Sequence, residues 1–361
     1  MVSDMTMKYH HKIPFDAGIP GHRRRKNRNG TEVAPAVTIA LHNHRCEMIP
    51  LAIDRMRRCD IVILEEPPDE NLMKMVKGEV SINEYISGID TEYPEFGRRM
   101  ALALRRLHRD SIRIIQIEPY LEYLLEIHNR FVDGVRPADL ETDTALWPVY
   151  EMERRATRAL IDFYEASSQN DFDVMLKTTK AFAKVDARRF AMRDRLRARS
   201  IARVAAHGRY IYVEAGQMHV GLAQALRQHL PVCQGVAALY LTPGGVIPQP
   251  APASRIGPGD VLTLIYTFNP DFDSPMADLW AARALVQNKI IIKNEITADT
   301  GDFPHTRDEA ETSRLVHELD LDMCRYLMPL LDKKTTAQAR QAVERALTYG
   351  KSTTGHGTNT M

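Results

Sequence analysis

The amino-acid sequence predicts an α/β fold with a mainly parallel sheet, flanking helices and a large helical cap. Short apolar runs alternate along the chain with segments of helical periodicity, as in proteins built from strand–helix–strand units. Two charged segments, 71–110 and 120–190, have helical periodicity and no strand alternation, which predicts the cap. The chain has 361 residues, of which 44% are hydrophobic, so it can form a sizeable core.

Four short apolar runs are the strands on which the functional argument depends. They lie at Val37–Leu41, Ile61–Leu64, Ile112–Ile117 and Tyr210–Glu214. Near-continuous runs of branched apolar residues are typical of parallel strands that are buried on both faces. Further strands are predicted at Val236–Leu241, Val261–Thr267 and Ile290–Ile292.

Helices are predicted where apolar residues recur at a spacing of three or four. In the short helix Met48–Arg58 these residues are Ile49, Ile53 and Met56. A long, charged helical segment runs from Glu151 to Ala206. The remaining predicted helices are Tyr120–Phe131, Val220–Leu230, Thr312–Leu331 and Thr335–Leu347.

The chain is predicted to contain a single α/β domain over residues 34–345, with the cap inserted in it. Residues 1–33 are polar and basic, with the run Arg23–Lys26, and are expected to be a solvated, flexible arm. A patch that binds phosphate or an acidic partner is the functional alternative for this arm. Residues 346–361 are expected to be a polar tail.

Composition excludes several classes of partner. The formal net charge of +1 gives no bulk field that would attract nucleic acid or an anionic membrane. The arginine-rich helical stripe 188–203 has almost no aromatic residues, which is typical of a solvated helix face. No apolar run approaches the ~18–20 residues of a membrane helix, and no signal peptide is recognised. The four cysteines have no metal-finger spacing and suit a reducing compartment.

We therefore expect a cytoplasmic protein that acts on a small molecule or a peptide and has neither a nucleic-acid nor a membrane partner. Whether the chain forms a homo-oligomer is left open by the sequence.

Polar residues follow the ends of the four main strands. The first strand is followed by histidines and a glutamate, the second and third by glutamates, and the fourth by a glycine and a histidine. In chain order they are His42, His44, Glu47, Glu65, Glu66, Glu118, Gly216 and His219. Because the carboxyl ends of parallel strands share one edge of a sheet, we expect these residues to converge there.

Two chemistries suit such a set. Two imidazoles and one or two carboxylates can hold Zn²⁺, Mn²⁺ or Co²⁺ with a position open for water. The candidate metal ligands are His42, His44, Glu47, Glu65, Glu118 and His219. Without a metal, the same groups could catalyse acid–base hydrolysis, with one histidine as base and a glutamate orienting it. Each residue also has a structural interpretation, such as a hydrogen-bonded core histidine or, for Glu118, a helix cap.

His219 is the strongest single candidate. Gly216 lets the backbone turn sharply at the end of a strand, and Gly221 follows where the backbone must approach another group closely. We therefore assign both glycines to cofactor binding and expect His219 to face a solvated cleft. The spacing matches neither the HExxH nor the GxSxG motif.

At two places the chain resembles the erythromycin esterase-like, ChaN-like and TraB–Tiki-like superfamily. The first covers residues 36–70, where Leu41-His42-Asn43-His44 stands in place of a Gly-x-x-His motif and a strand ends at Glu65. The second covers residues 190–225, where an Arg-Asp helix motif precedes the strand that ends in Gly216-Gln217-Met218-His219. Leu41 replaces the glycine of the first motif.

This resemblance implies a hydrolase-like site with His44, Glu65 and His219, on an ester or amide substrate. Arg193 would pair a carboxylate or an oxyanion, and Asp194 would orient an imidazole through its second ring nitrogen. The superfamily is functionally divided between metal-dependent proteases, a metal-free macrolide esterase and a haem-binding lipoprotein.

Two alternatives remain open. One is a protein that binds haem or an iron chelate through histidine or tyrosine, with Tyr212 and Met218 lining the pocket. The other is a degenerate scaffold without catalysis.

Overall fold

The computed structural model describes residues 36–89, 91–205, 209–231, 234–242, 256–297 and 303–354. The predicted basic arm over residues 1–33 and most of the proline- and glycine-rich segment 242–258 lie outside the described residues. Among the described residues, no helix combines the length and the apolar composition needed to cross a membrane.

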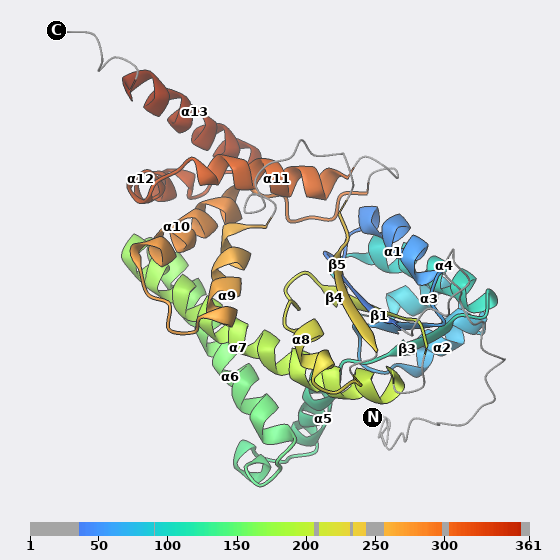
Figure 1. The fold of residues 1–361 in the computed structure, drawn as a ribbon. Helices are drawn as coiled ribbons and strands as arrows, with labels where there is room; N and C mark the ends of the chain where they lie inside the picture. Colours follow the sequence, from blue (N-terminus) through green and yellow to red (C-terminus); the bar gives the residue numbers. More distant parts are fainter. Residues whose placement is uncertain are drawn as a thin grey trace, which may run out of the picture. The chain divides into compact units, whose positions relative to one another are not determined.

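The centre of the described chain is one five-stranded sheet in which every strand pair is parallel (Figure 1). The strand order is β3-β2-β4-β1-β5. The strands are β1 (Ala36–His42), β2 (Ile61–Leu64), β3 (Arg113–Gln116), β4 (Ile211–Gly216) and β5 (Gly235–Tyr240). The predicted α/β class, the parallel sheet and these five strands are therefore confirmed.

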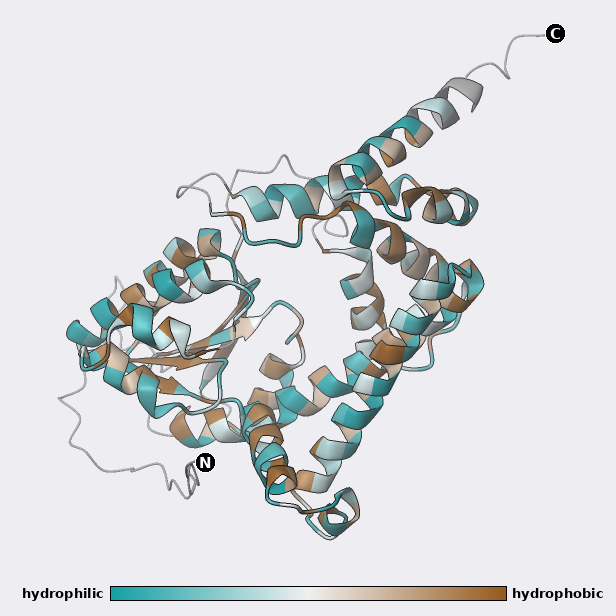
Figure 2. Cartoon of the chain, turned by 180° about the vertical axis from the view of Figure 1, so that it is seen from behind, coloured by the Kyte–Doolittle hydropathy of each residue, from teal (hydrophilic) through white to brown (hydrophobic). Residues whose placement is uncertain are grey.

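Alternating side chains give each face of the sheet its own core, and Figure 2 shows the strands as mainly hydrophobic. Val62, Leu64 and Tyr212 face one layer of helices, whereas Ile63 and Val213 face another. The first layer is α1 (Ile49–Met56), α2 (Glu70–Lys77), α3 (Ile82–Ser87) and α4 (Pro94–Arg109). The second is the end of α7 (Phe172–Ala205) and α8 (Leu222–Arg227).

The segment 71–110, predicted as part of the cap, instead forms a helical layer on one face of the sheet. It is helical, but its helices connect β2 to β3 and bury Leu72, Leu104 and Leu107 against a sheet face. A crossover between parallel strands must return over a face of the sheet, so an amphipathic helix in such a connection becomes a sheet layer.

A second core, built only from helices, involves the first half of α7 and the last third of the chain. Its members are the end of α6 (Leu146–Gln169), the first half of α7, α9 (Pro258–Phe268), α10 (Pro275–Ile290), α11 (Pro304–His317), α12 (Leu321–Leu331) and α13 (Thr336–Thr354). We call these elements the helical body. α5 (Pro119–Val132) packs against α6 and α7 beside it. Two short 3-10 turns lie at Cys46–Met48 and Pro137–Leu140.

Two predicted strands in this region are wrong. Residues 261–267 lie inside α9, where Leu262 and Tyr266 are buried one helical turn apart. Ile290 is the last residue of α10, and Ile291 is its extended C-cap. Short apolar runs have no periodicity that separates a buried strand from a buried helix, and packing in the helical body decides the outcome. The predicted tail is also shorter, because α13 continues through Thr354.

Candidate active site

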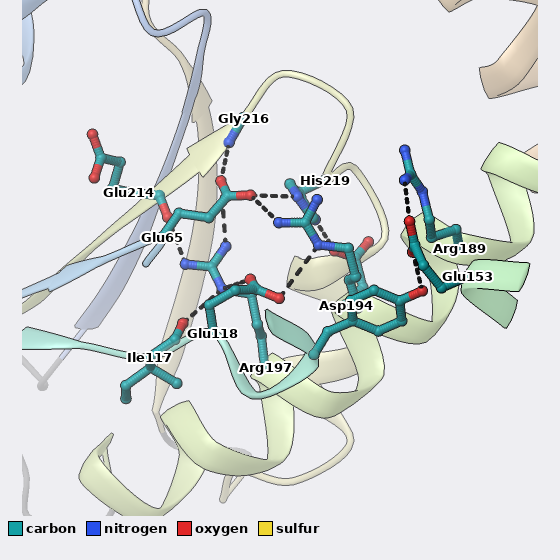
Figure 3. Close-up of polar contacts among 12 residues, drawn as sticks. Glu65, Ile117, Glu118, Glu153, Arg189, Asp194, Arg197, Glu214, Gly216 and His219 are labelled. Carbon is teal, nitrogen blue, oxygen red and sulfur yellow. Dashed lines mark hydrogen bonds and ion pairs between the residues drawn. The ribbon is translucent and has the colours of Figure 1, made fainter. Parts of the chain in front are cut away.

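The carboxyl edge of the sheet brings together Glu65, Glu118, Gly216 and His219, which follow three of the strands, as predicted (Figure 3). His42 at the end of β1 is paired in register with Gly216 at the end of β4. Glu65 follows β2 directly, and Glu118 lies just beyond β3. Strand order places β4 between β1 and β2, so groups from three neighbouring strands meet near Gly216.

Glu65 is the centre of this arrangement. Its carboxylate accepts hydrogen bonds from the backbone N–H of Gly216 at 2.5 Å and from Nη2 of Arg193 at 2.9 Å, and it lies 2.7 Å from Nε2 of His219. Nη1 of Arg197 is 3.6 Å away. Burial alone would raise the pKa of Glu65, but His219 and Arg197 hold this pKa well below its ordinary value. Glu65 is therefore a fixed anion and a poor proton acceptor.

His219 is held between two carboxylates. Its Nδ1 lies 2.6 Å from Asp194 and its Nε2 lies 2.7 Å from Glu65. Burial lowers the pKa of His219, but the two carboxylates outweigh this effect and raise it. An imidazole donates through both nitrogens only when it is protonated, so His219 is a cation in this structure.

The expectation that His219 faces a solvated cleft is wrong. Its side chain is only 1% exposed, and the ring of Phe190 packs edge-on against it. Both ring nitrogens are committed to carboxylates, so His219 is not available as a base. The expected role of Asp194, to orient this imidazole, agrees with the contact.

Arg193 and Arg197 join Glu118 to the same set of charges. Nε of Arg193 donates to Glu118 at 3.3 Å, and Nε of Arg197 lies 3.1 Å from the other oxygen of Glu118. Arg197 is fully buried and also donates to the backbone carbonyls of Ile117 and Glu214. Glu118 stands at the N-cap position of α5, but its side chain forms no cap hydrogen bond. We call Glu65, Glu118, Arg193, Asp194, Arg197 and His219 the anchored network.

The two glycines predicted to bind a cofactor instead lie close to residues of the anchored network. A Cβ on Gly221 would lie 2.8 Å from Oδ2 of Asp194, so only glycine lets α8 approach the carboxylate that holds His219. A Cβ on Gly216 would lie 3.6 Å from Glu65, 3.7 Å from His219 and 3.9 Å from His44. The predicted residues His44, Glu65 and His219 thus converge around one point beside Gly216.

His44 is the accessible imidazole at this point. Its side chain is 37% exposed, and its Nε2 lies 3.8 Å from Oε1 of the buried Glu214. The rings of Phe96 and His42 pack edge-on against it, with centroids 5.6 and 5.3 Å away. These contacts fix the ring while leaving one side open.

His42 is buried beneath His44. Its Nδ1 donates to the backbone carbonyl of Asn43 at 2.8 Å, and burial lowers its pKa, so the ring is neutral. Its Nε2 lies 3.8 Å from Glu214 and has no hydrogen-bond partner among the described residues. Glu214 was not identified as a site residue from the sequence, although a carboxylate inside an otherwise apolar buried strand is an unusual feature that could have identified it.

Glu47 and Glu66, which also follow strands, form no hydrogen bond or ion pair with the anchored network among the described residues. Glu47 accepts from the backbone N–H groups of His305 and Thr306 and from the hydroxyl of Thr306, so it caps the start of α11. Glu66 is exposed and accepts from the side chain of Gln116. The prediction of Glu47 as a metal ligand is therefore wrong.

The predicted metal ligands do not fit a metal ion in this arrangement. No group of three or more His, Cys, Asp or Glu side chains within the described ranges is placed to hold one. Glu65 and Glu118 are bound to arginines, and both nitrogens of His219 face carboxylates. Tyr212, expected to line a haem pocket, is completely buried in the sheet core.

Two carboxylates from the helical body reach the same edge of the sheet. Asp260 of α9 accepts from Nε2 of Gln217 at 2.9 Å. Both carboxylate oxygens of Glu309, on α11, lie 3.4 Å from Nδ2 of Asn43. Asn43 and Gln217 belong to the two turns that carry His44 and His219. Neither acid has a motif around it, so no local pattern indicates this placement.

Fold and site together define an α/β protein whose polar residues gather at the carboxyl edge of a parallel sheet. No protein-family model and no solved structure matches the chain. The chain is similar to an uncharacterized protein of Archaeoglobus fulgidus, with 27% identity over 289 residues. The aligned region covers 78% of this chain and 94% of that protein.

Proposed function

We propose that the protein is a hydrolase that uses His44 as the base for a water molecule, with an ester or amide as substrate. The main support for this proposal is the partly exposed imidazole of His44, which faces the buried Glu214 and lies next to the point beside Gly216. A base for water must be accessible and must have a nearby group that stabilises its protonated form. His44 meets both conditions, whereas His42 is buried and His219 is already protonated.

The proposed step begins with transfer of a proton from water to the imidazole of His44 while the water oxygen attacks the carbonyl carbon. Glu214, at 3.8 Å, stabilises the imidazolium that forms. Phe96 and His42 restrict the ring, which reduces the entropy lost on reaching the reactive geometry.

The anchored network supports this step without exchanging protons. Its carboxylates and cations form contacts of 2.6–3.6 Å, which fix the ends of β2 and β4 around the reaction point. Nε and Nη2 of Arg193 bind Glu118 and Glu65, and its side chain is 16% exposed. We assign its Nη1 as the donor to the oxyanion, because preorganised donors stabilise developing charge strongly. The resemblance to the esterase-like superfamily agrees with this proposal.

The test is hydrolysis of a panel of nitrophenyl esters and short peptides by the purified protein. The unaltered protein should exceed the buffer rate on at least one ester, and His44→Gln should lower that rate by about 10²–10⁴-fold. His128→Gln is the matched control, because His128 is exposed on α5 and has no contact with the site. Equal rates for the His44 variant and the control would refute the proposed base.

The same preparation distinguishes the alternatives. A chelator wash that abolishes activity, together with bound Zn, Mn or Co by mass spectrometry, would make the protein a metallohydrolase instead. A Soret band would indicate a haem-binding protein.

A further inference from the structure

Two carboxylates of the helical body contact the turns that carry His44 and His219. Glu309 is in contact with Asn43, which lies between His42 and His44 in the sequence. Asp260 binds Gln217, the residue that follows Gly216. Each of the two turns that form the reaction point is therefore contacted by one acid from α9 or α11, and the assigned water chemistry uses neither.

Glu309 has the surroundings of a proton donor. It lies in the second turn of α11 and is partly buried, and burial raises its pKa to about 7, with Asp260 of α9 and Glu47 adding to the rise. Arg45, from the segment after β1, and the hydrogen bond from Asn43 oppose this effect. The weak 3.4 Å contact with Asn43 leaves Glu309 without a strong charged partner among these groups.

We propose that Glu309 donates the proton to the leaving group, and that the substrate is therefore an alkyl ester or an amide. This proposal rests on the proposed hydrolase function. An alkoxide or an amide anion is a poor leaving group and must be protonated as it departs, whereas a nitrophenolate leaves without help.

The protons balance over one turnover. His44 takes a proton from water as the carbon–oxygen bond to water forms. The bond between the carbonyl carbon and the leaving group then breaks, and the proton of the Glu309 carboxyl moves to the leaving oxygen or nitrogen. His44 releases its proton to solvent and Glu309 takes one up, so water and substrate become an acid and an alcohol or amine.

The test compares two esters that share one acyl group, one with an alkyl and one with a nitrophenyl leaving group, at pH 6. Glu309→Gln should lower the rate on the alkyl ester by about 10²-fold or more and the rate on the nitrophenyl ester by less than about 3-fold. The control is Glu311→Gln on the same helix, whose side chain is 53% exposed, and it should leave both rates unchanged.

The outcomes separate the two proposals. Equal loss on both esters, or no loss on either, would overturn the role of Glu309 while leaving the hydrolase intact. No turnover of either ester by the unaltered protein would overturn both. If Glu309→Gln fails to fold, the pH dependence of the unaltered protein decides. The ratio of the alkyl to the nitrophenyl rate should fall above about pH 7, and a constant ratio would refute the proposal.

Discussion

Nε2 of His219 lies 2.7 Å from Oε1 of Glu65, so the most conspicuous histidine of the sequence forms a fixed ion pair. The accessible imidazole is instead His44, just after the end of another strand. Two histidines that look equivalent in the sequence thus have different surroundings, because His219 is bound by carboxylates at both nitrogens and His44 is partly exposed. This difference leads to separate predictions for the two residues.

His219→Ala should destabilise the protein strongly. Removing the cation leaves Glu65 and Asp194 buried without it, and breaking one partner of a buried ion pair costs about 3–5 kcal/mol. Urea unfolding of the variant measures this loss. His128→Ala, on the exposed face of α5, should change the free energy of unfolding by less than about 0.5 kcal/mol. A loss below about 1 kcal/mol in His219→Ala would contradict the network described here.

Gly216→Ala and Gly221→Ala should separate activity from stability. A methyl group on Gly221 would meet Asp194 at 2.8 Å, so this variant should lose about 1–3 kcal/mol through overpacking. The nearest atom to a methyl group on Gly216 is 3.6 Å away, and stability should stay within about 1 kcal/mol.

The Gly216 methyl group would nevertheless occupy the point where His44, Glu65 and His219 meet. We expect hydrolysis to fall by about 10-fold or more, because small displacements of reacting groups reduce rates strongly. Thermal melts and ester kinetics on both variants provide the measurement. An active Gly216→Ala protein would place the reaction elsewhere.

The free energy of unfolding should depend on pH through the raised pKa of Asp260. Burial raises its pKa from 3.8 to about 6 in the folded protein. The folded state therefore retains a proton that the unfolded state has released, so this contribution is fully present below about pH 3.8 and is lost as the pH rises through about 6. The shift corresponds to a loss on the order of 3 kcal/mol.

Asp260→Asn should remove this part of the pH dependence. The difference in unfolding free energy between pH 4 and pH 7 should become smaller than in the unaltered protein. Asp271→Asn, at an exposed position shortly after α9, should keep the full difference. If the free energy of unfolding depends on pH in the same way in both variants, Asp260 does not have the raised pKa described here.

The sequence predicted the sheet more completely than the site. The strands β1 to β5 are near-continuous apolar runs between helical segments, and this pattern also predicted that His44, Glu65, Glu118 and Gly216 would share one edge. It could not predict which histidine is free, because that depends on Asp194 and Arg193, which reach the edge from α7.

The contribution of the helical body was not predictable for a similar reason. The apolar run in α9 has the pattern of a buried strand, and Asp260 and Glu309 carry no motif. Their positions depend on how helices from the last third of the chain pack with α7. Contacts between segments so distant in the sequence leave no local pattern.

The central claim is that His44 removes a proton from water, and chemical rescue tests it most directly. His44→Ala should lose hydrolysis by about 10²–10⁴-fold, and free imidazole should restore part of the rate in a saturable manner. The space is accessible because the native side chain is 37% exposed. Imidazole should have no such effect on the unaltered protein or on His219→Ala. A His44→Ala protein that hydrolyses esters at the unaltered rate, without imidazole, would contradict the account.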